Sequence, residues 1–419
     1  MRFELSEDQA LLRSSTRDYF TKDAPLERSR RIMEHDARGF EAPQWRQLAE
    51  MGYLGLTVPA DKGGQGLGAV ELAVVCEEAG RVCLPGPLLD TVLAADFLAR
   101  AGGQDALVAD VCSGTKVVTI ARLDAGHGND AARVMGATLR GRKQFVPFAG
   151  AADALVVTTA DGVHLATGPF HVTPTPTIDL AQRFGTVEFE HAATRLGSVE
   201  LLEHTDRLAA VGAAAMLLGI MGRSLEMTLE YVNTRAAFQR PIGAFQALQH
   251  RLADMLLRTE STRSAVYRAA WCLAANDPDA SLACATAKAY AGDAARLVCG
   301  ETIQMHGGIG FTWELDAHVF FKRAKTLEQF YGSTEEQLER ALAAAGYRTS
   351  IAPQEEDFPC APPSSKPSAS RSSFATCPIP SAPPTAPSCA SRPTASAAPT
   401  GISGPATGRG WAWRSSRRG

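Results

Sequence analysis

Residues 235–246 read RAAFQRPIGAFQ, and a helical pattern follows directly with Leu252 and Asp254-Met255. Arg235 carries a planar guanidinium whose several donors suit phosphate oxygens. Gln246 would add a neutral hydrogen-bonding group. The plainer interpretation of Arg235 alone is a surface ion pair. An ordered stretch of this length is nevertheless far more specific than a lone glycine loop.

About 60 residues downstream, residues 304–311 read QMHGGIGF, with three glycines within four residues between helical segments. Glycine in such a segment is costly in conformational entropy, so the backbone must do something that a side chain would prevent. One explanation is a joint between two helices. The other is that Gly307 and Gly308 bring backbone N–H groups against a ligand, with Gln304 as a neutral donor nearby.

Outside these stretches, the hydrophobic periodicity of the sequence divides the chain into regions. Residues 1–115 alternate helical patterns with short breaks, and residues 196–347 are again helical, with a segment near 208–227 that is apolar nearly all round and should be buried. Residues 116–195 instead contain short β-rich runs separated by Gly, Asp and Pro, which predict a small antiparallel sheet domain. These runs are VVTIA, ATLRG, ALVVTT, GVHLAT, FHVTPT and GTVEFEH.

Residues 348–419 are rich in Pro, Ser, Ala and Thr and cannot assemble a core, so we expect a disordered tail. A linker or partner-binding tail is the conventional interpretation. The composition is also typical of GC-rich DNA translated out of frame. If the reading frame is shifted by one base, the codons for residues 365–369 can encode Glu-Ala-Phe-Arg. This shifted sequence would suit the beginning of a homologue encoded by the adjacent gene.

Composition limits the function classes. The chain has 419 residues, 45% hydrophobic and 21% charged, with a net charge of -3, so nothing in its charge predicts a nucleic-acid or membrane partner. No signal-peptide core and no apolar run of membrane-spanning length is apparent, so we expect a cytoplasmic protein. The nine cysteines are scattered singly, without metal-ligand spacing. We expect the first six to be buried and no metal to be bound.

The order of helical, β and helical domains, together with these motifs, resembles the acyl-CoA dehydrogenase family. Residues 235–255 are similar to the family signature RxxFGxPIGxFQxxxxxLADM, with Gln239 at the usual Gly. QMHGGIGF matches the family's QxxGGxG segment, and residues 54–66 resemble its LGL..PEEYGG turn. The resemblance covers residues 6–346. It implies an α+β multidomain fold with a helical N-terminal domain, an antiparallel middle domain and a C-terminal helical bundle.

In this family FAD lies extended at a subunit interface. The resemblance implies that one set of residues binds the diphosphate and adenosine end of the FAD held by a neighbouring subunit. The set is Arg235, Phe238, Gln246, Gln304, Gly307 and Gly308.

The residues that hold a chain's own flavin ring depart from the family pattern. Where members have a TEPxAGSD loop, residues 121–130 read ARLDAGHGND. Where members have W-[IV]-[ST]-N, residues 143–148 read KQFVPF. Phe145 keeps an aromatic face, but Pro147 can donate nothing where a hydroxyl belongs.

The family's catalytic base is also missing. Dehydrogenation requires a carboxylate to remove the α proton of the thioester, and many members supply it from a Y-E-G-T motif. Tyr331 stands at that place, and a phenol with a pKa of about 10 is a poor base at neutral pH. Other members take the base from the preceding long helix, where Ala209 stands here. Asp206 is one turn away, although an Asp at a helix start is more often a cap or dipole partner; Glu335 and Glu336 should lie on a solvated helix.

Contacts made to a neighbour's FAD are therefore kept, while those to the chain's own flavin ring are not. This resembles one subunit type of the actinobacterial α2β2 steroid acyl-CoA dehydrogenases, with a bulky steroid-derived acyl-CoA as substrate and an electron-acceptor flavoprotein as redox partner. One alternative is a self-sufficient homotetramer that uses Asp206 or Tyr331 as an unusual base. Another is a catalytically silent scaffold that stabilises a partner dehydrogenase.

Overall fold

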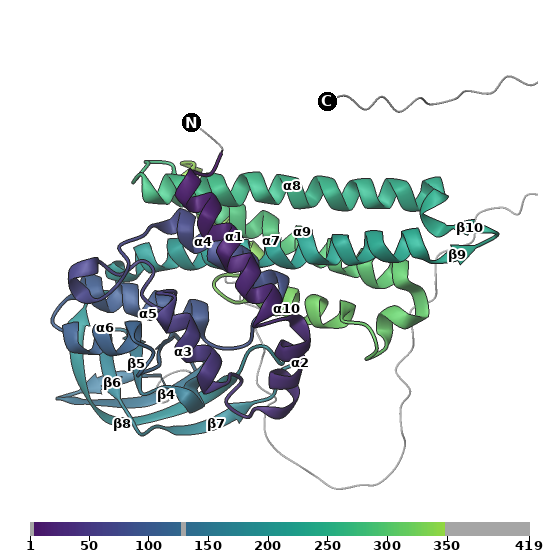
Figure 1. Cartoon of the computed structure of the whole chain (residues 1–419). Coiled ribbons are helices and arrows are strands. Elements are labelled where there is room, and N and C mark those ends of the chain that lie inside the picture. Colours follow the sequence, from purple (N-terminus) through teal and green to yellow (C-terminus); the bar gives the residue numbers. More distant parts are fainter. Residues whose placement is uncertain (1–3, 127–130, 348–419) are drawn as a thin grey trace, which may run out of the picture. The chain divides into compact units, whose positions relative to one another are not determined.

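A computed structural model describes residues 4–126 and 131–347 of the chain. Helices precede and follow a central sheet in the sequence, which confirms the predicted fold class (Figure 1). The boundaries predicted after residues 115, 195 and 347 stay predictions. The predicted disorder of residues 348–419, and part of the segment 121–130, fall outside the described residues.

The N-terminal helices form where the sequence provides caps and apolar spacing. Ser6 accepts a hydrogen bond from the backbone N–H of Gln9, whose side chain in turn accepts from the backbone N–H of Ser6, so the first helix begins with a capping box. Trp45 and Leu48 lie one turn apart and are both buried. The helices are α1 (Glu7–Lys22), α2 (Leu26–His35), α3 (Ala42–Glu50), η1 (Ala60–Lys62), α4 (Ala69–Arg81), α5 (Leu88–Ala101) and α6 (Asp105–Cys112).

The β region contains all six predicted runs and two shorter strands. The strands are β1 (Val118–Ala121), β2 (Leu123–Asp124), β3 (Arg133–Met135), β4 (Thr138–Pro147), β5 (Ala154–Thr159), β6 (Gly162–Thr167), β7 (His171–Thr175) and β8 (Phe184–Gly197), with η3 (Ala149–Ala151) between β4 and β5. β8 pairs with β4 and β7 along its first part and with β6 along its last, so it joins both parts of the sheet. Alternate side chains such as Leu139, Val157 and Phe189 meet in a separate small core.

The prediction of a purely antiparallel sheet is wrong for one pair, because β1 and β5 run parallel. Parallel neighbours need a long crossover connection, and here β2, β3 and β4 form it. The short runs could not reveal this, since it depends on which strand β1 meets and not on its own sequence.

The C-terminal helices are built around α7 (Leu202–Thr234), which contacts α4, α8 and α9 and is buried almost continuously from Leu208 to Met221. The other elements are η4 (Val199–Leu201), β9 (Ala236–Ala237), β10 (Arg240–Pro241), η5 (Ile242–Ala244), α8 (Gln246–Ala274), α9 (Ala280–His306), η6 (Gly307–Phe311), α10 (Ala317–Gln329) and α11 (Thr334–Ala344). α4 and α7 approach closely at Gly80 and Gly219, where an added Cβ would meet backbone atoms of the other helix.

Among the described residues, the segment Val199–Thr234 is long and apolar enough to cross a membrane by composition, but 89% of its most apolar window is buried inside the protein. Such a helix is typical of a protein core and is weak evidence for a membrane span. The six cysteines between Cys76 and Cys299 are free and buried, as predicted.

Candidate cofactor and active site

The two sequence motifs meet at one end of the helical bundle. α7 and α9 run parallel, since Thr228 bonds Thr302 at 3.1 Å and the rings of Tyr231 and His306 lie 4.4 Å apart. The C-terminal ends of both helices therefore coincide, and the strands β9 and β10 project from this end (Figure 1). We call the six residues predicted to bind FAD the motif end: Arg235, Phe238, Gln246, Gln304, Gly307 and Gly308.

The side chains of the motif end are exposed and have few partners in their own chain. Phe238 is 89% exposed, and its ring packs edge-on against the ring of Phe245, with 6.1 Å between the ring centroids. In residues 4–126 and 131–347, no hydrogen bond or ion pair engages the guanidinium of Arg235 or the amides of Gln246 and Gln304. An exposed large aromatic, three residues from a guanidinium that has no partner among the described residues, is typical of a surface that another molecule covers.

Backbone geometry explains the one departure in the first motif. Phe238 and Gln239 both adopt left-handed conformations, with φ of 52° and 64°. Glycine enters this region freely and other residues enter it at a cost. The usual family glycine at the position of Gln239 thus suits the backbone, and Gln239 keeps the turn despite its side chain.

The three glycines of QMHGGIGF have different reasons to be glycine. Gly307 has φ of 62°, which disfavours a side chain. An added Cβ on Gly310 would lie 2.4 Å from the carbonyl oxygen of Ile303. Gly308 has neither constraint, because nothing lies within 4 Å of its added Cβ. The joint between helices and the site for a ligand are therefore both consistent with this segment: the fold requires Gly307 and Gly310 and leaves Gly308 unexplained.

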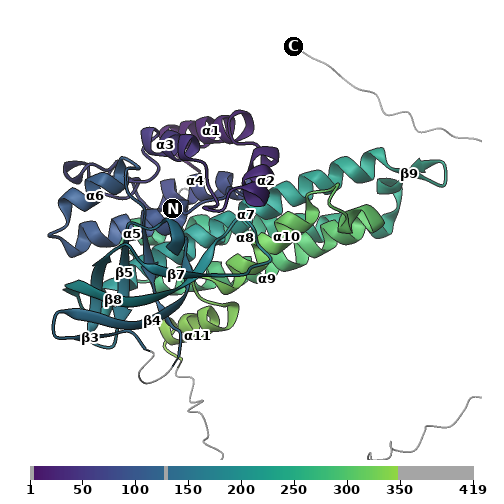
Figure 2. The same ribbon diagram turned by 90° about the horizontal axis from the view of Figure 1, so that it is seen from below.

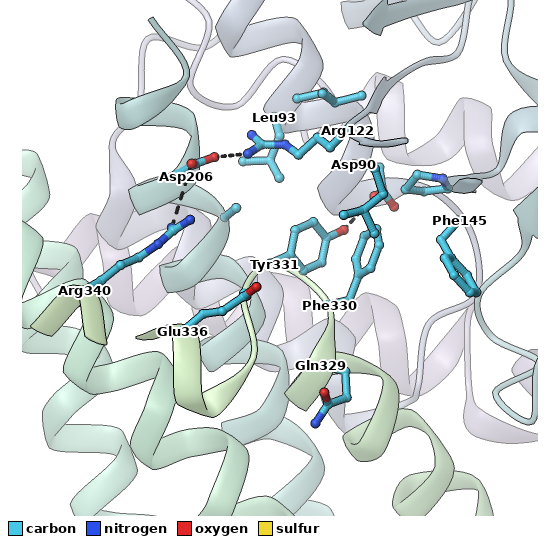
Figure 3. Close-up of a pocket in the computed structure, with 15 residues that line it drawn as sticks. Asp90, Leu93, Arg122, Phe145, Asp206, Gln329, Phe330, Tyr331, Glu336 and Arg340 are labelled. Carbon is cyan, nitrogen blue, oxygen red and sulfur yellow. Dashed lines mark hydrogen bonds and ion pairs between the residues drawn. The ribbon is translucent and has the colours of Figure 1, made fainter. Parts of the chain in front are cut away.

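A cavity of about 250 Å³ lies at the other end of α7, between the sheet and the helices (Figure 3). Its inner wall is buried and mostly apolar, whereas its mouth is half-buried to exposed and mostly charged. The inner wall comprises Asp90, Leu93, Ile120, Pro147 and Ala209. The mouth comprises Arg122, Phe145, Asp206, Glu336 and Arg340.

Tyr331 points into this cavity and donates its hydroxyl to Asp90 at 2.6 Å (Figure 3). Asp90 is 5% exposed, and burial raises the pKa of its carboxyl. Burial, followed by the neighbouring charge of Asp90, holds the pKa of the Tyr331 phenol well above its ordinary value. Tyr331 is thus a hydrogen-bond donor here and a still poorer base than a free phenol.

Asp206 lines the mouth of the cavity between two arginines. It forms ion pairs with Arg122 and, at 3.8 Å, with Arg340 (Figure 3). Asp206 is not a helix cap, because α7 begins at Leu202 and its N-cap residue makes no side-chain capping bond. The alternative role of Asp206 as a dipole partner stays a prediction. The carboxylate of the nearby exposed Glu336 accepts from the backbone N–H of Ser333 at 2.8 Å and caps α11.

Lys288 holds the turn that carries Tyr331. Its fully buried ammonium donates to the carbonyl oxygens of Glu328 at 3.1 Å and Gly332 at 2.9 Å. Burial lowers the pKa of Lys288 to about 8. These two hydrogen bonds join the end of α10 to the turn after it and so fix the position of Tyr331.

The motif end and the cavity lie far apart in one chain. Asp206 is near the start and Arg235 caps the end of a helix of 33 residues, which at the α-helical rise is roughly 50 Å long. Figure 2 shows the sheet and the label of β9 at opposite sides of the molecule. No single dinucleotide spans this length, so any one cofactor can use only one of the two places in a given chain.

Two family descriptions match the sequence. "Acyl-CoA dehydrogenase, N-terminal domain" matches residues 6–107, and "Acyl-CoA dehydrogenase, C-terminal domain" matches residues 207–346. Acyl-CoA dehydrogenase IpdE2 of Mycolicibacterium smegmatis is 34% identical over 341 residues, covering 81% of this chain and 99% of that protein. The chain belongs to the acyl-CoA dehydrogenase family.

Two solved complexes support the same assignment. The ChsE4-ChsE5 complex from Mycobacterium tuberculosis contains a chain with 30% identity and a TM-score of 0.76, covering 83% of this chain and all of that one. A Tcur3481-Tcur3483 complex, described as a steroid acyl-CoA dehydrogenase, contains a chain with 30% identity and a TM-score of 0.73, covering 81% and 98%. The predicted likeness to a subunit of the steroid type is thereby confirmed.

The motif end fits the FAD that the acyl-CoA dehydrogenase family implies. Arg235 offers a guanidinium that has no side-chain partner in the described part of the chain, Phe238 a largely exposed apolar face, and Gly308 an open stretch of backbone. The roles of these residues toward FAD stay predictions. Sequence reasoning missed Asp90 and Lys288, because each matters only through a contact with the turn at 328–332; the polar residue Asp90 in the otherwise apolar start of α5 was the one available signal.

Proposed function

We propose that this chain is a subunit of an FAD-dependent acyl-CoA dehydrogenase that introduces an α,β double bond into a CoA thioester. Its motif end would bind the diphosphate and adenosine half of an FAD whose flavin ring lies with a homologous partner chain. A steroid-derived acyl group is the proposed substrate class, since one similar complex is described as a steroid acyl-CoA dehydrogenase. Bound FAD would accept the hydride from the β carbon.

One observation carries this proposal: the two ends of α7 differ in what they leave available. At the motif end, Arg235, Gln246 and Gln304 lack side-chain partners among the described residues. At the cavity, Tyr331 already donates to Asp90 and Asp206 is held between two arginines. A chain that supplied its own base would need a free acceptor beside the substrate's α carbon, and the partner chain would supply it instead.

The residues of this chain would act by binding and orientation. Arg235 would donate two parallel hydrogen bonds to the FAD diphosphate, and the N–H of Gly308 would approach it without steric hindrance. Phe238 would cover an apolar part of the cofactor and exclude water. No proton transfer is assigned to this chain, which is the main difference from a self-sufficient homotetramer.

The test is the FAD content of the chain produced alone and with its homologous partner. We expect FAD only after co-production, at one FAD for each pair of chains. Full FAD occupancy of the chain alone would instead support the homotetramer. A complex without FAD would support a silent scaffold and would contradict the proposal.

A further inference from the structure

We propose that Asp90 and Tyr331 recognise a hydroxyl group on the acyl part of the ligand that enters the cavity. This inference rests on the proposed function only in assuming an acyl-CoA ligand. It adds a chemical requirement to that function: the acyl group must carry a hydrogen-bond donor where it meets the inner wall.

Asp90 and Tyr331 form a polar site in the otherwise apolar inner wall of the cavity. Leu93, Ile120 and Ala209 surround it in the cavity lining. Burying a carboxylate among such side chains is unfavourable unless hydrogen bonds compensate for the lost water. The nearby cation, Arg323, bonds Asp179 at 3.1 Å and the side-chain oxygen of Gln182 at 2.8 Å, not Asp90. A polar group kept in this place needs a purpose beyond packing.

The hydrogen bonds already made define what the pair still lacks. Asp90 accepts from Tyr331 at 2.6 Å and more weakly from the Gln182 amide at 3.4 Å. A carboxylate has about four acceptor positions, and a phenol has one donor, which Tyr331 has used. Every remaining position on both groups is an acceptor. The complementary ligand group is a donor such as a hydroxyl, whereas a ketone or ether would face acceptors only.

The mouth of the cavity sets the ligand's direction. Arg122 and Arg340 lie at the exposed rim, on either side of Asp206. An anionic CoA group is stabilised beside these cations and is excluded from the buried wall. The acyl group must therefore enter first and meet Asp90 and Tyr331 inside the cavity.

A structural alternative is that the hydrogen bond between Tyr331 and Asp90 only ties the turn after α10 to α5. That role predicts no preference among ligands. Recognition of a hydroxyl predicts that ligands with a hydroxyl bind more tightly than ligands without one. It also predicts that this preference weakens or reverses when the acceptors are altered.

The experiment measures binding of three CoA thioesters to the full chain by titration calorimetry: 3-phenylpropanoyl-CoA, its 4-hydroxyphenyl analogue and its 4-methoxyphenyl analogue. We expect the hydroxyl analogue to bind about tenfold to hundredfold more tightly than the other two. Tyr331→Phe should reduce this ratio of affinities. Asp90→Asn should also raise the affinity for the methoxy analogue relative to the hydroxyl analogue, because the new Asn amide adds a donor.

Asp206→Asn is the matched control, because it changes a carboxylate of the same cavity at the mouth and should shift all three affinities together. Equal binding of the three thioesters to the parent chain would overturn the inference, as would failure of all three to bind. A hydroxyl preference that survives in both Asp90→Asn and Tyr331→Phe would do the same. The binding ratio is independent of the FAD measurement, so either proposal can fail without the other.

Discussion

At the C-terminal end of α7 the polar side chains of the motif end are exposed and have no side-chain hydrogen bond or ion pair within residues 4–126 and 131–347, whereas at its N-terminal end the candidate residues are paired with one another. Arg235 and Phe238 face outward from the first place. Tyr331 with Asp90, and Asp206 with its arginines, fill the second. Groups without partners can bind a cofactor without first breaking bonds, whereas Tyr331 has already used its only donor on Asp90. Under the proposed function, this chain keeps a surface that binds the cofactor, and its partner supplies the base.

The two ends also differ in what maintains them. Two hydrogen bonds from the buried Lys288 hold the turn that carries Tyr331. The motif end depends on backbone shape, in the left-handed residues 238–239 and the glycines 307–310. Substitutions should therefore disturb the cavity end through charge and the motif end through steric contact.

The largest effect on stability is expected for Lys288→Met and depends on pH. Burial lowers the pKa of Lys288 from 10.5 to about 8, so between these values the unfolded chain binds more protons than the folded one. Stability contributed by this group therefore rises with pH across that window. Urea unfolding should show the parent gaining about 3 kcal/mol relative to the variant between pH 7 and pH 11. A pH-independent difference would mean that Lys288 is not buried as described.

A second prediction compares two glycines of QMHGGIGF. Gly310→Ala should lower the free energy of unfolding by about 1–3 kcal/mol, since the added methyl would overlap the carbonyl oxygen of Ile303. Gly308→Ala should leave stability unchanged, because its Cβ enters open space, but should weaken FAD retention in the complex. If both variants are equally stable and both keep FAD, the distinction between the two glycines fails.

The smallest effect is expected at the candidate bases. Tyr331→Phe and Asp206→Asn should each change the turnover of the complex by less than about tenfold, whereas loss of a general base costs about 10²–10⁴-fold. The substrate should be an acyl-CoA without a hydroxyl group, so that ligand recognition does not contribute. A loss of several powers of ten in one variant would assign the base to that residue and favour the homotetramer.

The sequence predicted the fold well because the fold depends on local patterns, whereas the FAD roles of the motif end stay predictions. A few consecutive residues are enough to recognise each of the six β runs, the buried segment after Leu208 and the two motifs. The meeting of the motifs followed from the resemblance alone, and the structure explains it physically through the parallel packing of α7 and α9.

The cavity end could not be predicted in the same way. Asp90 and Tyr331 are 241 residues apart, and Arg122 and Asp206 belong to a strand connection and a helix. Their contacts depend on how the sheet packs against the helices, which no local pattern encodes. The parallel pairing of β1 with β5 was missed for the same reason.

The central claim is that Arg235 binds an FAD shared with a partner chain, and the FAD content of the co-purified complex tests it most directly. Arg235→Ala should still assemble but lose FAD on dilution, at a cost of about 2–5 kcal/mol, and Arg235→Lys should restore only part of the affinity. Arg240→Ala is the control, since Arg240 lies 4.1 Å over the Phe245 ring in the same loop and should leave FAD content unchanged. We predict substoichiometric FAD after gel filtration for Arg235→Ala and one FAD per pair of chains for Arg240→Ala; parental FAD content in Arg235→Ala would contradict the shared site.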